Sequence, residues 1–332
     1  MSAFVTGATG FLGRRLVRAL REDGMPVRCY VRLSSDVQEL RDFVGESLWE
    51  GVEVVRGELT DSVACRDALH GCRVVYHLAA ALSGGTASLF LNTVVATRCL
   101  MNAALEQDIA RFVLVSSFGV YGAALLKRGS LLDETTPVEP EPHRRDPYTY
   151  SKVIQEQAAW EAYRQQGLPL VVIRPGVIYG DERGVLSGRV GLKLGNLMIR
   201  MGGSQPVPYT YVDNCARAIL QAGIVPGIEG EAFNIIDDKL PTASQVLKGF
   251  RRAGGKIRGL WIPGPVIGML SSMYDWYHRF SKGQLPGAIT RYKSANQWKR
   301  LQYSNAKAKS RLGWTPQVSF EEALTRSRVR TK

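Results

Sequence analysis

Short apolar runs alternate with segments of helical periodicity along the first half of the chain. An apolar run bounded by polar turns predicts a buried strand, and apolar residues that recur every three or four positions predict a helix. Strands are expected at Ala3–Thr6, Val27–Arg32, Val52–Arg56, Val74–His77, Phe112–Ser116 and Leu170–Ile173, with a returning strand at Ala232–Ile235. Helices are expected at Phe11–Glu22, Val63–Leu69, Thr86–Glu106, Tyr148–Gln165 and Cys215–Ala222. This alternation predicts an α/β fold, a doubly wound parallel sheet with helices on both faces.

A glycine-rich loop, TGATGFLG, joins the first predicted strand to the first helix. Glycine permits the tight turn, a close approach of backbone to phosphate, and close packing of helix on strand. The free N–H groups and the positive dipole end of the following helix attract the pyrophosphate of a dinucleotide. The loop therefore predicts a Rossmann-type cofactor site formed by Gly7, Thr9, Gly10, Phe11, Leu12 and Gly13.

The residue at the end of the second strand indicates which dinucleotide binds. NAD sites usually place an acid there to bind the ribose 2′-hydroxyl, whereas this chain has Arg32. A guanidinium can bind a 2′-phosphate, and Arg14 and Ser34 are expected near enough to help. NADP(H) is therefore the predicted cofactor, and NAD(H) is the alternative.

Further residues at the strand ends are expected to face the same cofactor. Glu58 and Leu59 follow the third strand, where an acid can accept a hydrogen bond from the adenine amino group. Ala79 and Ala80 follow the fourth strand, where small side chains let the backbone lie against the cofactor. His77 ends that strand with no nucleophile or base beside it, so it is expected to be structural.

Tyr148 and Lys152 lie four residues apart near the start of a predicted helix, so their side chains share one face. The ordinary pKa of tyrosine is about 10, and a neighbouring ammonium is expected to lower it. Ser117, after the fifth strand, can orient the reacting oxygen and stabilise its developing charge. These groups predict the transfer of a proton and a hydride. A second Y-x-x-x-K, from Tyr303 to Lys307, follows no strand of the predicted cofactor core and is interpreted as coincidental.

Together these motifs resemble the extended short-chain dehydrogenases/reductases, the NAD-dependent epimerase/dehydratase family. The resemblance runs nearly end to end, through TGATGFLG, HLAA, SSFGVYG, PYTYSK, IRPGVIYG, YTYVDN, FNI and RLGWTP. It implies that Ser117, Tyr148 and Lys152 are the catalytic residues. It also implies cofactor contacts from Ser116, Pro175 and Val177, besides Tyr148 and Lys152 themselves.

The branch of the family is indicated by two apolar positions. Nucleotide-sugar members typically carry asparagine and arginine where this chain has Val177 and Val207, although Arg189 or Lys193 could replace them. The PYTYVDN segment and the closing sequence resemble the 3β-hydroxysteroid dehydrogenase and dihydroflavonol reductase branch. The resemblance therefore implies an NADP(H)-dependent oxidoreductase that interconverts a secondary alcohol and a ketone on a hydrophobic molecule. The alternatives are a nucleotide-sugar epimerase, dehydratase or reductase, and a catalytically silent NADP-binding regulator.

The remainder of the chain predicts a second, smaller unit. Residues 122–147 form a long polar loop of the kind that often borders an active site. Ser187–Pro208 and Leu240–Lys299 are expected to be helices and connections. We divide the chain into an NADP-binding core over 1–180, completed by about 209–236, and a small, mostly helical substrate lobe over 181–208 and 240–300. A basic C-terminal segment follows over 301–332.

The net charge of +13 is the unusual feature of the composition. Residues 287–332 hold eleven Lys and Arg against two acids, a local charge of +9. No nucleic-acid motif accompanies this charge, so nucleic acid is not an expected partner. Apolar residues at Val266–Tyr277 recur at helical spacing and, with the basic segment, predict weak association with a membrane surface. The alternative is a core-facing helix followed by a solvated tail.

The five scattered cysteines form no C-x-x-C or Cys/His cluster, so neither disulfides nor a metal site are expected. No signal peptide and no apolar run of ~18 residues are expected, which favours a cytoplasmic protein, or a peripheral one at the membrane. The family resemblance implies a homodimer in which Thr86–Glu106 and Tyr148–Gln165 pair with their copies. The candidates for that seam are Leu100, Ala103, Ile154, Ala158 and Ala159.

Overall fold

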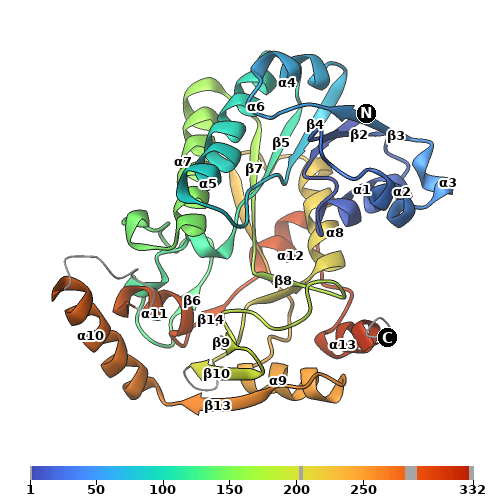
Figure 1. Cartoon of the computed structure of the whole chain (residues 1–332). Helices are drawn as coiled ribbons and strands as arrows, with labels where there is room; N and C mark the ends of the chain where they lie inside the picture. The colour runs from blue at the N-terminus through green and yellow to red at the C-terminus, as the bar shows by residue number, and fades with distance from the viewer. Residues whose placement is uncertain (1, 202–204, 281–289, 329–332) are drawn as a thin grey trace.

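Seven parallel strands form the central sheet of the computed structural model, which describes residues 2–201, 205–280 and 290–328 (Figure 1). The strand order is β12-β7-β5-β4-β1-β2-β3, and each neighbouring pair is parallel. The strands are β1 (Ser2–Thr6), β2 (Val27–Val31), β3 (Val52–Arg56), β4 (Cys72–His77), β5 (Arg111–Val115), β7 (Leu170–Pro175) and β12 (Glu231–Ile235). The predicted doubly wound sheet is confirmed, and each strand lies within a few residues of its expected range.

Helices cover both faces of this sheet. One face packs on α1 (Gly13–Glu22), α8 (Val212–Ile224) and α12 (Ala306–Leu312). The other packs on α4 (Ser62–Leu69), α6 (Ala96–Leu105) and α7 (Pro147–Gln166). Short helices α2 (Gln38–Val44) and α3 (Glu46–Trp49) lie beside α1. Two apolar cores therefore sandwich the sheet, as the continuous apolar runs of its strands require.

The helix expected at Thr86–Glu106 is interrupted by a π-helical turn. It consists of α5 (Thr86–Phe90), the turn at Leu91–Val95, and α6. By length and composition Thr86–Leu105 is apolar enough to cross a membrane, a property that the sequence analysis did not assign to it, and half of it is buried. Its apolar side chains Leu100 and Met101 pack into the protein core, as in an ordinary core helix.

The residues expected to form a dimer seam are mostly core residues. Leu100, Ala103, Ala158 and Ala159 are all less than 10 % exposed within a single chain. Only Ile154 is partly exposed. The prediction that the first four form the seam is wrong, because these small and apolar side chains fill the space between α6, α7 and the sheet.

The strand order reverses at β1, which lies between β4 and β2. The chain goes from β1 to β2 and β3 on one flank of β1, and then crosses to β4, β5, β7 and β12 on the other flank. A crevice opens at such a switch point, at the carboxyl ends of the strands, and ligands of doubly wound folds bind there. The glycine loop after β1 and Ser117 after β5 therefore lie at the same edge of the sheet.

The smaller lobe contains a three-stranded sheet besides its helices (Figure 1). Its strands are β9 (Gly191–Leu194), β10 (Leu197–Met201) and β13 (Arg258–Ile262), and its helices are α9 (Ala243–Arg252), α10 (Gly264–Phe280) and α11 (Arg291–Trp298). The expectation of helices within Ser187–Pro208 is wrong: β9 and β10 form an antiparallel hairpin there. Gly195 has a φ of 55° in its turn, a conformation that glycine adopts without strain.

The C-terminal part of the chain returns to the core. β14 (Gln302–Tyr303) pairs with β6 (Leu131–Leu132), and Trp314 is buried against α8, where its indole N–H donates to the carbonyl of Asn214 at 2.9 Å. The Asn214 side chain in turn accepts the backbone N–H groups of Gln317 and Val318. A last helix, α13 (Phe320–Arg328), follows. The YTYVDN and RLGWTP motifs are therefore locked together.

The basic residues of this segment are partly neutralised. Lys307 and Arg311 pair with Glu231, and Lys309 pairs with Asp238. These three of the eleven basic residues of 287–332 are thus paired with acids, so α12 is not part of a solvated basic tail.

Candidate active site

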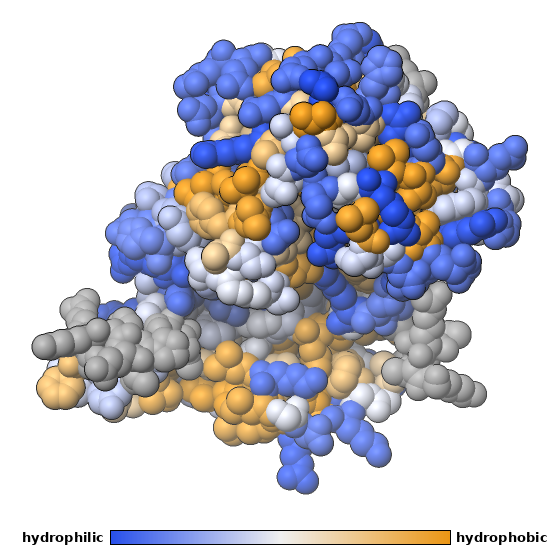
Figure 2. Space-filling view, turned by 45° about the horizontal axis from the view of Figure 1, so that its top comes forward, coloured by the Kyte–Doolittle hydropathy of each residue, from blue (hydrophilic) through white to orange (hydrophobic). Residues whose placement is uncertain are grey.

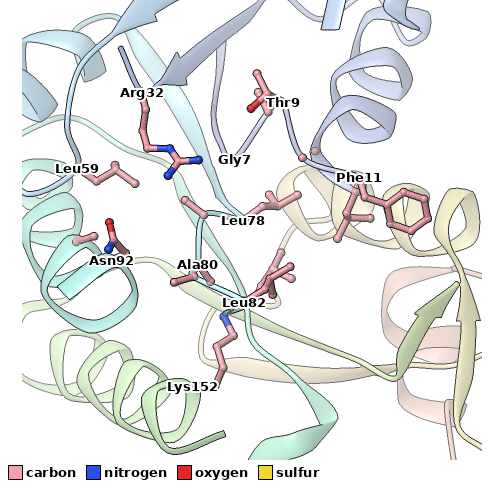
Figure 3. Close-up of a pocket in the computed structure, with 18 of the residues that line it drawn as sticks. Gly7, Thr9, Phe11, Arg32, Leu59, Leu78, Ala80, Leu82, Asn92 and Lys152 are labelled. Atoms are coloured by element: carbon pink, nitrogen blue, oxygen red, sulfur yellow. Dashed lines mark hydrogen bonds between the residues drawn. The ribbon is translucent and has the colours of Figure 1, made fainter. Parts of the chain in front are cut away.

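A cavity of about 650 Å³ opens at the switch point, at the carboxyl ends of β1, β2, β4, β5 and β7 (Figure 3). Apart from Arg14 and Ser34, the residues predicted for the site line it: Gly7, Thr9, Gly10, Phe11, Leu12, Gly13, Arg32, Glu58, Leu59, Ala79, Ala80, Ser116, Ser117, Tyr148, Lys152, Pro175 and Val177. Segments far apart in the sequence thus meet in one place. The hydrogen bonds and burial of each of these residues determine which role it can take.

The glycine loop packs directly on the end of β4. Gly7 has a φ of 69°, and a Cβ built there would lie 2.9 Å from the backbone nitrogen of Ala79. A Cβ on Gly13 would lie 2.0 Å from the carbonyl oxygen of Gly7. Side chains at either position would displace the loop from the sheet. The residues that open α1 line the cavity, and the N-terminus of a helix is a favourable place for a pyrophosphate.

Arg32 extends over the cavity from the end of β2 (Figure 3). No ion pair to it is found in the part of the chain that the structure describes, so its charge is available to an anion. Arg14 does not assist it, contrary to expectation, because Arg14 is bound to Glu39 at 2.6 Å and to Glu182. Ser35, rather than the expected Ser34, lines the cavity beside Arg32.

Ser117 and Tyr148 face each other across the inner end of the cavity. Ser117 caps a short 3₁₀ turn, and its Oγ accepts the N–H of Gly119 at 3.0 Å, which leaves the hydroxyl proton free to donate. Tyr148 lies in the first turn of α7, a helix that begins at Pro147 and is capped by Asp146. Burial raises the pKa of Tyr148, and the hydrogen bond with Ser117 acts in the opposite direction.

Lys152 lies beneath the cavity and is almost completely buried. Its Nζ donates to the carbonyl of Val115 at 2.8 Å and to Oε1 of Gln155 at 2.6 Å. Burial lowers the pKa of Lys152 to about 7, although the charge of Glu156 opposes this shift. The expected lowering of the Tyr148 pKa by Lys152 is not found: burial raises this pKa, and the groups that act on the phenol are Ser117, Asp146 and Arg183.

A buried ion pair between Arg174 and Glu156 lies close to Lys152. Arg174 Nε donates to Glu156 at 3.1 Å, and both side chains are at most 5 % exposed. Ser116 Oγ donates to the same carboxylate at 2.5 Å, so the Ser116 hydroxyl is directed at Glu156. Burial acts to raise the pKa of Glu156, but the charge of Arg174 holds it below its usual range. The sequence analysis missed this pair, whose partners are 18 residues apart.

His77 is a buried, hydrogen-bonded residue, as expected. Its Nδ1 lies 2.7 Å from Thr6 Oγ1, and its Nε2 lies 2.8 Å from Thr97 Oγ1. Burial, followed by the charge of Lys152, lowers the pKa of His77 to about 3, so the ring is neutral.

Arg183 belongs to the site although it was not predicted, and Tyr303 lies outside it. Arg183 was missed by the sequence analysis; it lines the cavity, stacks 5.2 Å from the centre of the Phe11 ring, and its charge acts to lower the pKa of Tyr148. Its signal was its place just after IRPGVIYG. Tyr303 of the second Y-x-x-x-K contacts Phe118 edge-on, and Lys307 pairs with Glu231, so this copy has a packing role.

Metal ligands are not part of this arrangement. Over residues 2–201, 205–280 and 290–328, no group of three or more His, Cys, Asp or Glu side chains is placed to hold a metal ion. The five cysteines are free thiols, four of them buried.

Comparison with known proteins agrees with the geometry. The model of the family described as "NAD dependent epimerase/dehydratase family" matches residues 3–235. Sterol demethylase protein B of Methylococcus capsulatus is 34 % identical over 267 residues, which cover 78 % of this chain and 76 % of that protein. A 3-beta-hydroxysteroid dehydrogenase of Mycolicibacterium neoaurum is 26 % identical over 344 residues, 96 % of this chain and 88 % of that protein.

Other matches are shorter or structural. Cinnamoyl-CoA reductase 1 of Petunia hybrida is 34 % identical over 181 residues; the match spans 53 % of this chain and about half, 54 %, of that protein. Among solved structures, a UDP-glucuronic acid 4-epimerase from Bacillus cereus in complex with NAD has a TM-score of 0.73 at 21 % identity, over 99 % of this chain and 98 % of that one. It shows a shared fold. With the cofactor loop, the Ser-Tyr-Lys arrangement and these matches in view, the chain belongs to the NAD-dependent epimerase/dehydratase family and is an NAD(P)-dependent oxidoreductase of the extended short-chain dehydrogenase/reductase type.

Proposed function

We propose that this protein is an NADP(H)-dependent oxidoreductase that interconverts a secondary alcohol and a ketone on a hydrophobic, steroid-like or other polycyclic substrate. The observation that carries the proposal is the convergence of Ser117, Tyr148 and Lys152 at one end of a cavity whose other end holds Arg32. A nicotinamide dinucleotide bound along this cavity supplies the hydride donor or acceptor.

Each of the three catalytic side chains has a distinct task in this proposal. The Ser117 hydroxyl, which is hydrogen-bonded with the Tyr148 phenol in this structure, donates to the reacting oxygen when substrate is bound. The Tyr148 phenol gives or takes the proton at that oxygen, and general acid–base catalysis of this kind contributes about 10²–10⁴-fold. Lys152 lines the same cavity and is assigned the positive charge that holds the cofactor and substrate in place, and the charge of Arg183 acts on the phenol itself.

A hydrophobic substrate is supported by the residues near Tyr148. Leu82, Val177 and Ile178 give this end of the cavity apolar walls. Val207 is buried in the core of the lobe, where an arginine for a sugar diphosphate would have no solvent or ligand to meet. Neither Arg189 nor Lys193 lines the cavity. Relatives named for sterols and 3-beta-hydroxysteroids support the same substrate class.

The test is a turnover assay with NADP⁺ and NADPH on a panel of sterol alcohols and ketones, in parallel with UDP-sugars and NAD⁺. We expect activity on members of the first set and none on the second. Turnover of UDP-sugars alone would replace this proposal with the epimerase alternative. Tight cofactor binding without turnover of either set would favour a silent regulator.

We also propose that the cytoplasmic enzyme attaches reversibly to an anionic membrane surface through α10 and β13. One face of α10 packs inward through Ile267 and Ser271, whereas Met269, Met273 and Trp276 are more than half exposed. On β13, Leu260 and Trp261 are each 52 % exposed. Figure 2 shows apolar side chains gathered along the lower edge of the molecule, where β13 and α10 lie. Exposed basic residues Lys256 and Arg258 adjoin this face in the sequence.

Flotation with anionic and neutral vesicles at low and high salt tests the attachment. An apolar face with adjoining cations should bind anionic vesicles and release as salt rises. Absence of binding at low salt would leave the protein free in the cytoplasm.

For the homodimer we propose a seam on the exposed face of the same helices. Leu91 is 50 % exposed and Val95 is 39 % exposed, and Ile154 on α7 is partly exposed. Sedimentation should show a dimer at micromolar concentration that Leu91→Glu dissociates. A monomer in the wild-type protein would remove this proposal.

A further inference from the structure

We infer that Gln155 and Thr97 are positioning residues for Lys152, and that with His77 they form a hydrogen-bonded chain from the lysine to the glycine loop. This inference rests on the proposed function, in which Lys152 acts on Tyr148. The chain runs Lys152, Gln155, Thr97, His77, Thr6, and all five side chains are at most 3 % exposed.

The lysine end of the chain fixes how the ammonium points. An ammonium has three protons, and two of them are taken by the Val115 carbonyl and by Gln155 Oε1. The third is left for the cavity, which Lys152 lines and toward which it points in Figure 3. Without Gln155 the ammonium would keep one protein acceptor and would be free to rotate. Gln155 therefore aims the remaining N–H.

The middle of the chain has a single consistent set of donors. Gln155 Nε2 donates to Thr97 Oγ1 at 2.6 Å, and the Thr97 hydroxyl donates to the carbonyl of Thr93 at 2.5 Å. Thr97 Oγ1 has no second proton, so the 2.8 Å contact with His77 Nε2 requires that nitrogen to be the donor. His77 Nδ1 is then an acceptor.

The far end of the chain reaches the cofactor loop. Thr6 donates its hydroxyl proton to His77 Nδ1 at 2.7 Å and accepts the N–H of Ala79 at 3.2 Å. Thr6 precedes Gly7, and Ala79 lies against Gly7. The neutral ring of His77 suits this arrangement, because a protonated ring would have no acceptor nitrogen for Thr6. The orientation of Lys152 is thereby tied to the position of the glycine loop.

The ionisable groups around Lys152 set the expected pH dependence. The charge of Glu156 favours the charged form of Lys152, the nearby His77 is neutral, and Tyr148 and Arg183 line the same cavity as Lys152. Because the pKa of Lys152 is about 7, kcat/KM should fall above that pH as the ammonium loses its proton. Gln155→Glu places a carboxylate against the ammonium and should move this alkaline limb upward by about one pH unit.

The decisive comparison is Thr97→Val with Thr97→Ser and Thr210→Val. Thr97→Val keeps the shape but breaks the chain, and we expect kcat to fall about ten- to a hundredfold with little change in the KM for the substrate. Thr97→Ser restores the hydroxyl and should recover most of that loss. Thr210→Val is the matched control, because the buried Thr210 hydroxyl has no hydrogen-bond partner and does not line the cavity.

The outcomes separate this inference from the proposed function. If Tyr148→Phe is inactive but Thr97→Val keeps wild-type kcat and Gln155→Glu keeps the wild-type pH profile, the positioning chain is refuted while the catalytic assignment stands. If Tyr148→Phe retains turnover, the proposed function itself fails. Should Thr97→Val not fold, as judged by circular dichroism, Gln155→Leu takes its place, because it removes the acceptor of the ammonium, and wild-type kcat in that variant would refute the chain.

Discussion

The floor of the cavity buries polar side chains, whereas the outer face of the smaller lobe exposes apolar ones. Beneath the cavity, Lys152, Glu156 and Arg174 are charged groups at most 5 % exposed, and each has protein partners. On α10, by contrast, Met273 is 60 % and Trp276 67 % exposed. Buried charges are costly unless paired, and exposed apolar patches usually mark a surface that meets something else. The charged groups of the first region have their partners within the chain, whereas the second region is the apolar surface for which membrane attachment is proposed.

The largest effect is expected from Tyr148→Phe, which tests the catalytic assignment of the cavity. Removal of one hydroxyl takes away the transferable proton, so kcat should fall by about 10²–10⁴-fold. NADPH affinity, measured by fluorescence titration, should change little because the ring and Lys152 stay in place. Tyr303→Phe is the control, since Tyr303 does not line the cavity. Equal losses in both variants would contradict the assignment of the site.

The next largest effect is expected from Glu156→Gln. This change leaves Arg174 as an unpaired buried charge, and breaking such a pair costs about 3–5 kcal/mol of unfolding free energy. Chemical denaturation measures this loss. Glu22→Gln breaks the surface pair between Glu22 and Arg217 and should have little measurable effect, because exposed pairs are screened by water. Similar losses in both variants would show that the buried pair contributes no more to the unfolding free energy than the exposed pair does.

Cofactor choice should respond to Arg32→Asp. Loss of a hydrogen bond to a charged group is worth about 1.5–3 kcal/mol, so NADPH should bind about ten- to a hundredfold more weakly. NADH, which lacks the 2′-phosphate, should lose little affinity. Isothermal titration of both cofactors against both proteins measures the four values. Equal affinity of the unaltered enzyme for NADPH and NADH would contradict the NADP(H) preference.

The smallest effect on stability is expected on the lobe. Met273→Gln should change the unfolding free energy by no more than about 0.5 kcal/mol, as is usual for surface substitutions. The core replacement Leu100→Ala should cost about 2–5 kcal/mol. The same Met273→Gln protein should nevertheless bind anionic vesicles more weakly than the wild type. A large loss of stability from Met273→Gln would mean that α10 belongs to the core after all.

The sequence predicted the parts of the molecule that local chemistry determines. Gly7 and Gly13 follow a strand and open a helix, and Tyr148 and Lys152 share a helix face, so each motif carries its own geometry. The cavity gathers all of these residues, although their catalytic and cofactor-binding roles stay predictions. Contacts between distant segments were not predictable in this way. Gln155 and Thr97 meet across 58 residues, and no periodicity links them.

Contacts between segments that are distant in the sequence also explain the wrong predictions. Arg14 seemed free for a phosphate because its acidic partner Glu182 is remote in sequence. The β9–β10 hairpin depends on pairing with β13, which the chain supplies about sixty residues later. The seam residues on α6 and α7 were predicted from the family resemblance, and the sequence does not show whether apolar side chains on a helix pack within the chain or against a second copy.

The return of Trp314 to the core bears on how the protein is made. Ribosomes deliver the chain from its N-terminus, so the seven strands, which end with Ile235, emerge well before Trp314. Until Trp314 is made, the apolar core that contains Cys215, Ile219 and Trp314 lacks one of its members. Incomplete apolar cores of this kind recruit chaperones or aggregate. The nascent protein therefore cannot finish its sheet sandwich during synthesis of the strands, and ribosome-stalled chains that end before Trp314 should stay protease-sensitive.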